Sequence, residues 1–246
     1  MERDIFMDGY ISYTFGAEKA DRHFRSLLKV PTLGPDDVGY SDAQSHFDVT
    51  VAGRSLVLDL RVDLQRGSIV PQEFWQPKSE AIHILHVSNA TLCMPTFFIR
   101  QDGSIGVPLA DAVEGDLRGI RDAGTHVKLG GRASIHLRMN WPGYSTRAWK
   151  KQFSTKDETQ ARKPITVNRF VGHIGRSVDA FIKAASLMPT SNQQWKLGKD
   201  GFGRGDIILI GAVHVSAGIL MPILQVNRHV LDVSLPPELD RLIQSM

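Results

Sequence analysis

The spacing of apolar residues predicts a long amphipathic helix over 166–185. At about 100° per residue, its large apolar side chains fall within an arc of roughly 120°, as a helix packed on a core requires. Thr166 is a suitable N-cap, because its hydroxyl can accept a backbone N–H of the first turn. The pattern over 17–29 predicts a shorter helix that ends before Val30 and Pro31. The apolar arc consists of Val167, Phe170, Val171, Ile174, Val178, Phe181, Ile182 and Ala185.

Elsewhere apolar and polar residues alternate in short runs that indicate strands. Two hairpins are predicted over 46–64 and 94–108, and further strands over 5–15 (or a hairpin edge), 133–139 and 147–154. The most apolar runs, 206–215 and 218–226, are expected to form a central pair. Because strands are not regularly interleaved with helices, we predict an α+β fold with a mostly antiparallel sheet and the long helix packed on it.

Alternation along 55–64 assigns its two faces. Leucines and Val62 share one face, which we expect to be buried. Asp59 and Asp63 share the other face with Val57 and Arg61, so we expect both carboxylates to be exposed to solvent.

Composition is that of a globular chain. The 246 residues are 42% hydrophobic and 22% charged, which favours one folded domain over 1–246, with a weak division near 110–125. No apolar run is long enough to span a bilayer, so we expect no membrane insertion. The N-terminus is acidic where a secretory signal is basic, and Cys93 is the only cysteine. Both features favour a cytoplasmic protein.

Charge is unevenly distributed along the chain. Residues 1–125 carry 12 Lys/Arg and 18 Asp/Glu, whereas residues 126–183 carry 12 and 3. The net charges are therefore −6 and +9. Such a basic segment either attracts an acidic partner or pairs internally with the acidic N-terminal half.

The densest basic stretch, within 138–163, is the candidate binding region. It also holds large aromatic residues, which can stack on bases. An acidic protein surface, a second copy of this chain and single-stranded nucleic acid are all compatible with this composition. On the long helix, Arg169, Arg176 and Lys183 form a basic stripe facing away from the core. The candidate partner-binding residues are Arg147, Lys150, Lys151, Lys156, Arg162, Lys163, Trp141 and Tyr144.

Catalytic and metal-binding patterns are weak. No Cys or His pair has the spacing of a structural zinc site, and no nucleophile motif is present. We therefore expect no metal and no cofactor. Gly172 and Gly175 resemble the glycine loop of KH-class RNA-binding domains, but the apolar arc continues through them. These glycines are better explained by a close neighbour of the helix.

One pattern resembles a group of uncharacterised fungal proteins. It comprises RMNWPGY at 138–144, Trp149, RKPIT at 162–166 and Trp195 before two apolar strands. The resemblance covers about residues 133–226 and implies a fungal origin and a self-contained domain. That group provides no activity or ligand to transfer.

The leading hypothesis is a non-catalytic intracellular protein that engages an acidic partner or another copy of itself through residues 138–163. A second hypothesis is an enzyme acting on a small metabolite, with His214 or His136 as acid or base. A third is binding of single-stranded nucleic acid.

Overall fold

The structure, a computed structural model, describes residues 5–230 except 76–78, 80–85, 88–89 and 145–148. The fold is α+β, as predicted, and the strands pair antiparallel except for the parallel pair β6–β9. The helices are α1 (Ile5–Asp8), α2 (Tyr10–Phe15), α3 (Ala17–Leu28), α5 (Leu109–Glu114) and α6 (Val167–Ala185). The strands are β1 (Gly39–Ser41), β2 (His46–Val51), β3 (Arg54–Leu60), β4 (Thr96–Phe97), β5 (Val107–Pro108), β6 (Ser134–Arg138), β7 (Lys150–Ser154), β8 (Ile207–Ser216) and β9 (Ile219–Val226).

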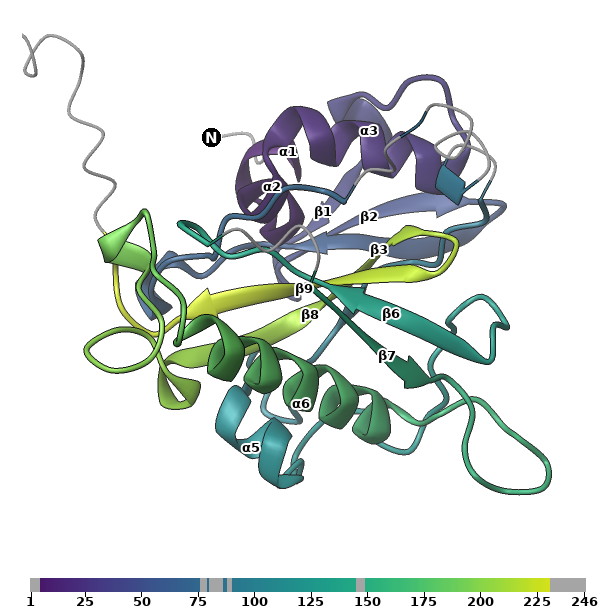
Figure 1. The fold of residues 1–246 in the computed structure, drawn as a ribbon. Helices are drawn as coiled ribbons and strands as arrows, with labels where there is room; N and C mark the ends of the chain where they lie inside the picture. Colours follow the sequence, from purple (N-terminus) through teal and green to yellow (C-terminus); the bar gives the residue numbers. More distant parts are fainter. Residues whose placement is uncertain (1–4, 76–78, 80–85, 88–89, 145–148, 231–246) are drawn as a thin grey trace, which may run out of the picture.

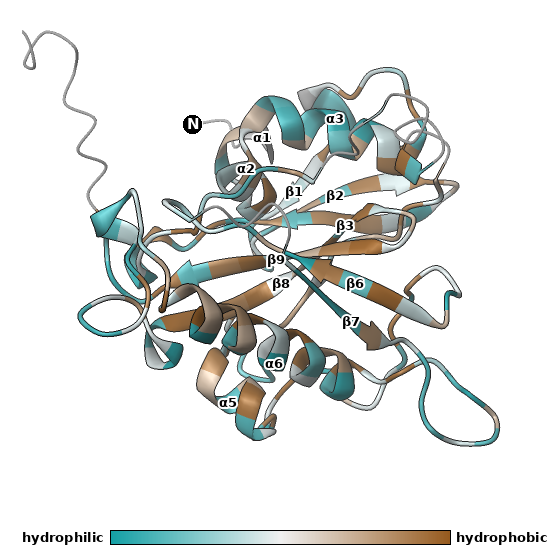
Figure 2. Ribbon diagram, viewed as in Figure 1, coloured by the Kyte–Doolittle hydropathy of each residue, from teal (hydrophilic) through white to brown (hydrophobic). Residues whose placement is uncertain are grey.

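Helix α6 has the predicted bounds, cap and buried face. The Thr166 hydroxyl accepts a hydrogen bond from the Arg169 backbone N–H, with 3.5 Å between the two atoms. The predicted apolar arc is buried except for Val167, which is half-buried. Brown residues line the side of α6 that faces the sheet in Figure 2. The helix is therefore held by burial of this one stripe.

Strands β8 and β9 lie at the centre of the fold. Their sheet has the order β4-β8-β9-β6-β7, with β5 also paired to β8. Alternate side chains of the two strands enter different hydrophobic clusters: Leu209 and Leu224 face the cluster of α6, whereas Val213 and Met221 face the N-terminal elements. Burial on both faces explains why these two runs are the most apolar in the sequence.

The N-terminal elements cover the face of β8 and β9 that lies opposite α6 (Figure 1). β1, β2 and β3 form a separate antiparallel sheet in that order. Helix α2 contacts both β3 and β9, so it joins the two sheets. Helix α3 buries Ala20 and Phe24 at the predicted helical spacing.

The expectation of a strand or hairpin edge over 5–15 is wrong, because these residues form α1 and α2. The start of α2 has Gly9 at its N-cap, which provides no side-chain acceptor. Asp59 of β3 provides one instead: its carboxylate accepts the Ile11 backbone N–H at 2.9 Å. A cap from a residue 48 positions away in sequence is invisible to any local pattern.

The predicted exposure of Asp59 is also wrong, because its side chain is fully buried. The pairing of β2 with β3 shifts register between Phe47 and Asp48, so the strict alternation along β3 is broken there. Leu58, Asp59 and Leu60 are consecutive buried residues in consequence. The bulge turns the Asp59 carboxylate towards α2.

The two glycines of α6 have different surroundings. A Cβ at Gly175 would lie 2.7 Å from the Cβ of Ala112 in α5, whereas at Gly172 its nearest contact is the flexible guanidinium of Arg176. The prediction of a close neighbour is thus confirmed for Gly175. The helix continues through both positions, unlike the interrupted helices of the KH class.

Candidate functional site

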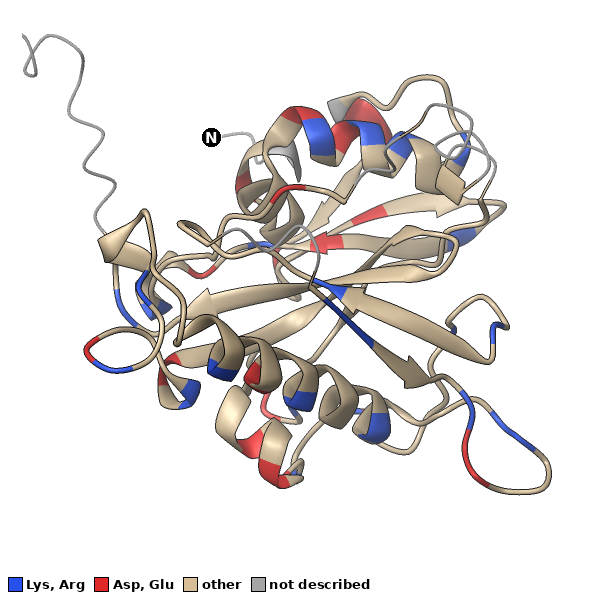
Figure 3. Cartoon of the chain, in the orientation of Figure 1, with Lys and Arg blue, Asp and Glu red and all other residues tan. Residues whose placement is uncertain are grey.

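The predicted basic segment lies on β7 and on the loop that follows it. Lys150 and Lys151 are exposed on β7, which is the last strand in the order of its sheet. Arg162 and Lys163 are exposed in the loop, and Lys156 is half-buried. The sixth predicted cation, Arg147, lies outside the described residues. Figure 3 shows this loop projecting from the body of the molecule, with basic residues on both of its arms.

Backbone contacts hold the loop in place. The Asp157 N–H donates to the Lys163 carbonyl oxygen at 2.8 Å, and Lys156 forms an isolated bridge with Pro164. The Asp157 carboxylate accepts a hydrogen bond from the Thr159 hydroxyl at 2.7 Å. That hydrogen bond lowers the pKa of Asp157, although burial opposes the effect. Asp157 is thus held within the loop, whereas Glu158, Arg162 and Lys163 are exposed.

The basic stripe of α6 is only partly available. Arg169 and Arg176 are exposed, but Lys183 forms an ion pair with Asp179 at 2.7 Å. Asp179 also pairs with Arg204 at 3.0 Å. The charge of Lys183 is thus offset within the protein, whereas the first two members of the stripe still face solvent.

Alternation along β7 separates its two lysines. Phe153 packs against α6, where its ring lies 5.1 Å from the ring of His173. Lys151, two residues earlier, shares that face of the sheet. Lys150 lies on the opposite face, paired in register with Arg138. The structure therefore does not bring all the predicted cations onto one surface.

With partial burial, Lys150 and Arg138 lower the pKa of a histidine on the same face of the sheet. Partial burial lowers the pKa of His136, and the positive charges of Lys150 and Arg138 lower it further. The Arg138 guanidinium lies 5.1 Å from the centre of the Trp75 ring. This face therefore disfavours a further positive charge.

Trp141 and Tyr144, both predicted to bind the partner, are core residues. Trp141 is 2% exposed, and its indole N–H donates to the Trp195 carbonyl oxygen at 2.7 Å. The Tyr144 hydroxyl accepts the Leu197 N–H at 2.8 Å. Neither ring is available to a partner, so we remove both from the candidate site. Trp141 and Trp195 instead join the segment after β6 to the 195–202 loop.

Six described cations remain on the α6 side of β7, in the loop that follows it and on α6, and we call them the basic surface; Lys150 lies on the other face of the sheet. None of them forms an ion pair within 4 Å in the described part of the chain. Internal pairing with acids of the N-terminal half therefore does not neutralise them. The basic surface comprises Lys151, Lys156, Arg162, Lys163, Arg169 and Arg176.

Neither His136 nor His214, proposed as acid or base, lines the groove of about 1030 Å³ between the end of β3 and the β4–β5 hairpin. His214 is 2% exposed, and its Nδ1 accepts the Cys93 N–H at 3.0 Å. Burial lowers the pKa of His214 to about 4, with a smaller contribution from Arg132. His214 is thus a neutral core residue at physiological pH.

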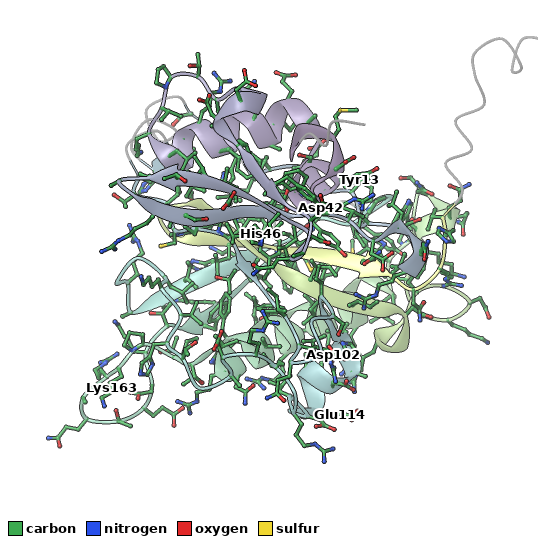
Figure 4. The ribbon with its side chains drawn as sticks, turned by 180° about the vertical axis from the view of Figure 1, so that it is seen from behind. Tyr13, Asp42, His46, Asp102, Glu114 and Lys163 are labelled. Atoms are coloured by element: carbon green, nitrogen blue, oxygen red, sulfur yellow. The ribbon has the colours of Figure 1, made fainter. Side chains whose placement is uncertain are left out.

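Sequence reasoning missed this groove of about 1030 Å³ beside His46, which Figure 4 labels in its view from behind. One wall of the groove is the end of β3 and the segment that continues to Arg66. The other wall is the hairpin that joins β4 to β5. His46 faces the groove from β2. Its residues come from five separate stretches of sequence, so no local motif marks it.

Neither a similar protein nor a metal site identifies the function of this chain. No known protein family matches the chain, and no curated protein or solved structure matches it significantly. Among the residues that the structure describes, no three His, Cys, Asp or Glu side chains are grouped to hold a metal ion. No described helix has the length and apolar character needed to cross a membrane.

Proposed function

We propose that this protein binds an acidic protein surface through its basic surface. The observation that supports this most directly is the lack of ion-pair partners for all six cations of the basic surface in the described structure. Unpaired positive groups collected on a loop and the adjoining helix produce a local field that attracts negative charge. A complementary acidic surface would bind mainly by electrostatic attraction.

A protein partner is favoured over single-stranded nucleic acid. Binding of single strands combines basic side chains with exposed aromatic rings on which bases stack. Here Trp141 and Tyr144 are buried, and Trp149 packs edge-on against Phe181. The basic surface therefore offers charge without stacking platforms.

An external partner is favoured over a second copy of the chain. Two acids of the N-terminal half are engaged locally: Asp21 pairs with Arg25, and Asp37 accepts the Gly34 N–H. Lysines on an edge strand such as β7 also repel the same strand of another copy. Both features weaken attraction between two copies.

The proposal is tested with a fluorescent poly-glutamate chain titrated over a series of salt concentrations. We expect binding that weakens with salt, because surface charges are screened. The triple variant Lys156→Glu, Arg162→Glu and Lys163→Glu should lower the affinity at low salt by at least about tenfold. The control, Lys19→Glu, Arg54→Glu and Lys199→Glu, makes the same change in net charge at scattered exposed sites.

Equal affinities of the two triple variants would refute the assigned surface. An oligothymidine titration tests the class of partner. Tighter binding of oligothymidine than of poly-glutamate, lost in the first triple variant, would reject the choice of a protein partner.

A further inference from the structure

The groove behind β3 has an apolar wall that is open to solvent. Leu64 is 45% exposed and Val57 is 37% exposed, although both belong to residue types that normally lie inside. Phe97, Ile99 and Ile105 of the opposite hairpin are half-buried and line the same space. Apolar surface gathered in a concave site is typical of ligand binding rather than of an ordinary exterior.

Three arginines line the groove with this apolar wall. Arg61 follows β3, Arg66 ends the next turn, and Arg121 lies beyond α5. None of the three forms an ion pair within 4 Å among the described residues. The groove also contains Asp63 and Asp122, so its charged lining is positive by one unit.

One of these two acids, Asp63, is already engaged. The Asp63 carboxylate accepts the Gln65 N–H at 3.0 Å, which caps the turn leading to Arg66. The carbonyl oxygen of Asp63 accepts the side-chain amide of Gln225 at 2.8 Å. The Asp63 carboxylate therefore binds a backbone N–H of the wall and forms no ion pair with the groove's arginines in the described structure.

The walls are fixed to each other and to the central sheet. The Arg66 guanidinium donates to the Ile105 carbonyl oxygen, which links the two sides. At the floor, the buried Tyr10 hydroxyl donates to the Gln225 side chain at 3.3 Å. Burial raises the pKa of Tyr10 to about 12, so its hydroxyl stays protonated. A groove held in this way loses little conformational entropy when a ligand binds.

We infer that the groove binds a small amphiphilic anion: an organic carboxylate whose apolar chain lies on the leucine and phenylalanine wall. Its carboxylate would accept hydrogen bonds from Arg61 and Arg121, since guanidinium and carboxylate have matching geometry. The volume lies at the upper end of small-molecule sites. This inference is independent of the proposed function, because the groove and the basic surface share no residue.

The experiment uses decanoate as the probe. 1-Decanol has the same chain without the negative charge, and acetate has the carboxylate without the long chain. Isothermal titration calorimetry of the full chain should show that decanoate binds at least about tenfold more tightly than 1-decanol, and acetate not measurably. The double variant Arg61→Gln and Arg121→Gln should weaken decanoate binding by about tenfold or more. Leu64→Ser should weaken it several-fold through the lost apolar contact.

Arg54→Gln with Arg118→Gln is the control variant, because both side chains are exposed and neither lines the groove. It should bind decanoate as the unaltered chain does. The inference is overturned by equal affinity for decanoate and 1-decanol, by an equal loss in the two double variants, or by no binding of decanoate. Circular dichroism of each variant checks that the fold is intact.

Discussion

The backbone N–H of Ile11 donates a hydrogen bond to the carboxylate of Asp59, with 2.9 Å between nitrogen and oxygen. The other carboxylate oxygen accepts the Leu60 N–H at 2.8 Å. Burial raises the pKa of Asp59 well above its usual value, although these backbone hydrogen bonds oppose the rise. One buried carboxyl group thus ties the start of α2 to β3.

Removing that group should destabilise the protein severely. Asp59→Ala leaves buried backbone donors without an acceptor, at a cost of about 3 kcal/mol in the free energy of unfolding. Asp59→Asn keeps one acceptor oxygen and should lose less. Asp63→Ala, which removes an exposed cap, is the control and should cost about 1 kcal/mol or less. Urea denaturation measures all three; a similar small loss for Asp59→Ala and Asp63→Ala would contradict the capping role.

These contacts explain which parts of the fold the sequence predicts. Helix α6 was predictable because its cap, apolar stripe and end all lie within its own residues. Helix α2 was not, because its capping group comes from Asp59, and the exposure of Asp59 depends on a bulge opposite β2. Local periodicity carries no information on either contact.

Stability should fall in mild acid because two histidines are buried without charge. Burial lowers the pKa of His23 to about 4, and His214 adds to the effect; the pKa of His214 is also about 4. Unfolding restores values near 6.5, so the unfolded chain binds more protons. The stabilisation is complete above about pH 6.5 and is lost as pH falls towards 4, by about 3 kcal/mol per histidine.

The comparison variant for this pH effect is His23→Phe. The phenylalanine ring can keep the stacked contact that His23 makes with Phe74. The substitution also removes the buried Nε2 of His23, which has no hydrogen-bond partner in the described structure. Urea denaturation between pH 7 and pH 4.5 should show a shallower decline for this variant. An identical pH dependence in both proteins would exclude His23 as a source.

The two glycines of α6 should respond in opposite directions to alanine. Gly172→Ala should stabilise the protein by about 0.5–1 kcal/mol, because alanine is the better helix former and its methyl group meets only the mobile end of Arg176. Gly175→Ala places a methyl group against Ala112 and should destabilise by about 1–3 kcal/mol. Thermal unfolding of the pair measures the contrast, and a stabilised Gly175→Ala would disprove close packing of α5 on α6.

The basic surface was partly predictable and the groove was not. Lys156, Arg162 and Lys163 are close in sequence and remain together in the structure, because one loop carries them. Trp141 was misassigned, since an aromatic residue near lysines has the same sequence signal whether it is buried or exposed. Arg61 and Arg121 reach one groove only through the packing of β3 beside the β4–β5 hairpin.

Reassigning Trp141 to the core yields a prediction that separates stability from binding. Trp141→Phe removes the indole N–H and leaves the buried Trp195 carbonyl oxygen without its donor, at a cost of about 2–3 kcal/mol. Poly-glutamate affinity, measured where the variant is fully folded, should stay within about twofold of the unaltered chain, because the ring touches no part of the basic surface. Tyr144→Phe should behave alike with a smaller loss, since only the acceptor for the Leu197 N–H disappears. Loss of poly-glutamate binding in a folded Trp141→Phe variant would show that the tryptophan belongs to the binding surface. A lower urea concentration at the midpoint of unfolding, with unchanged affinity for poly-glutamate, supports its place in the core.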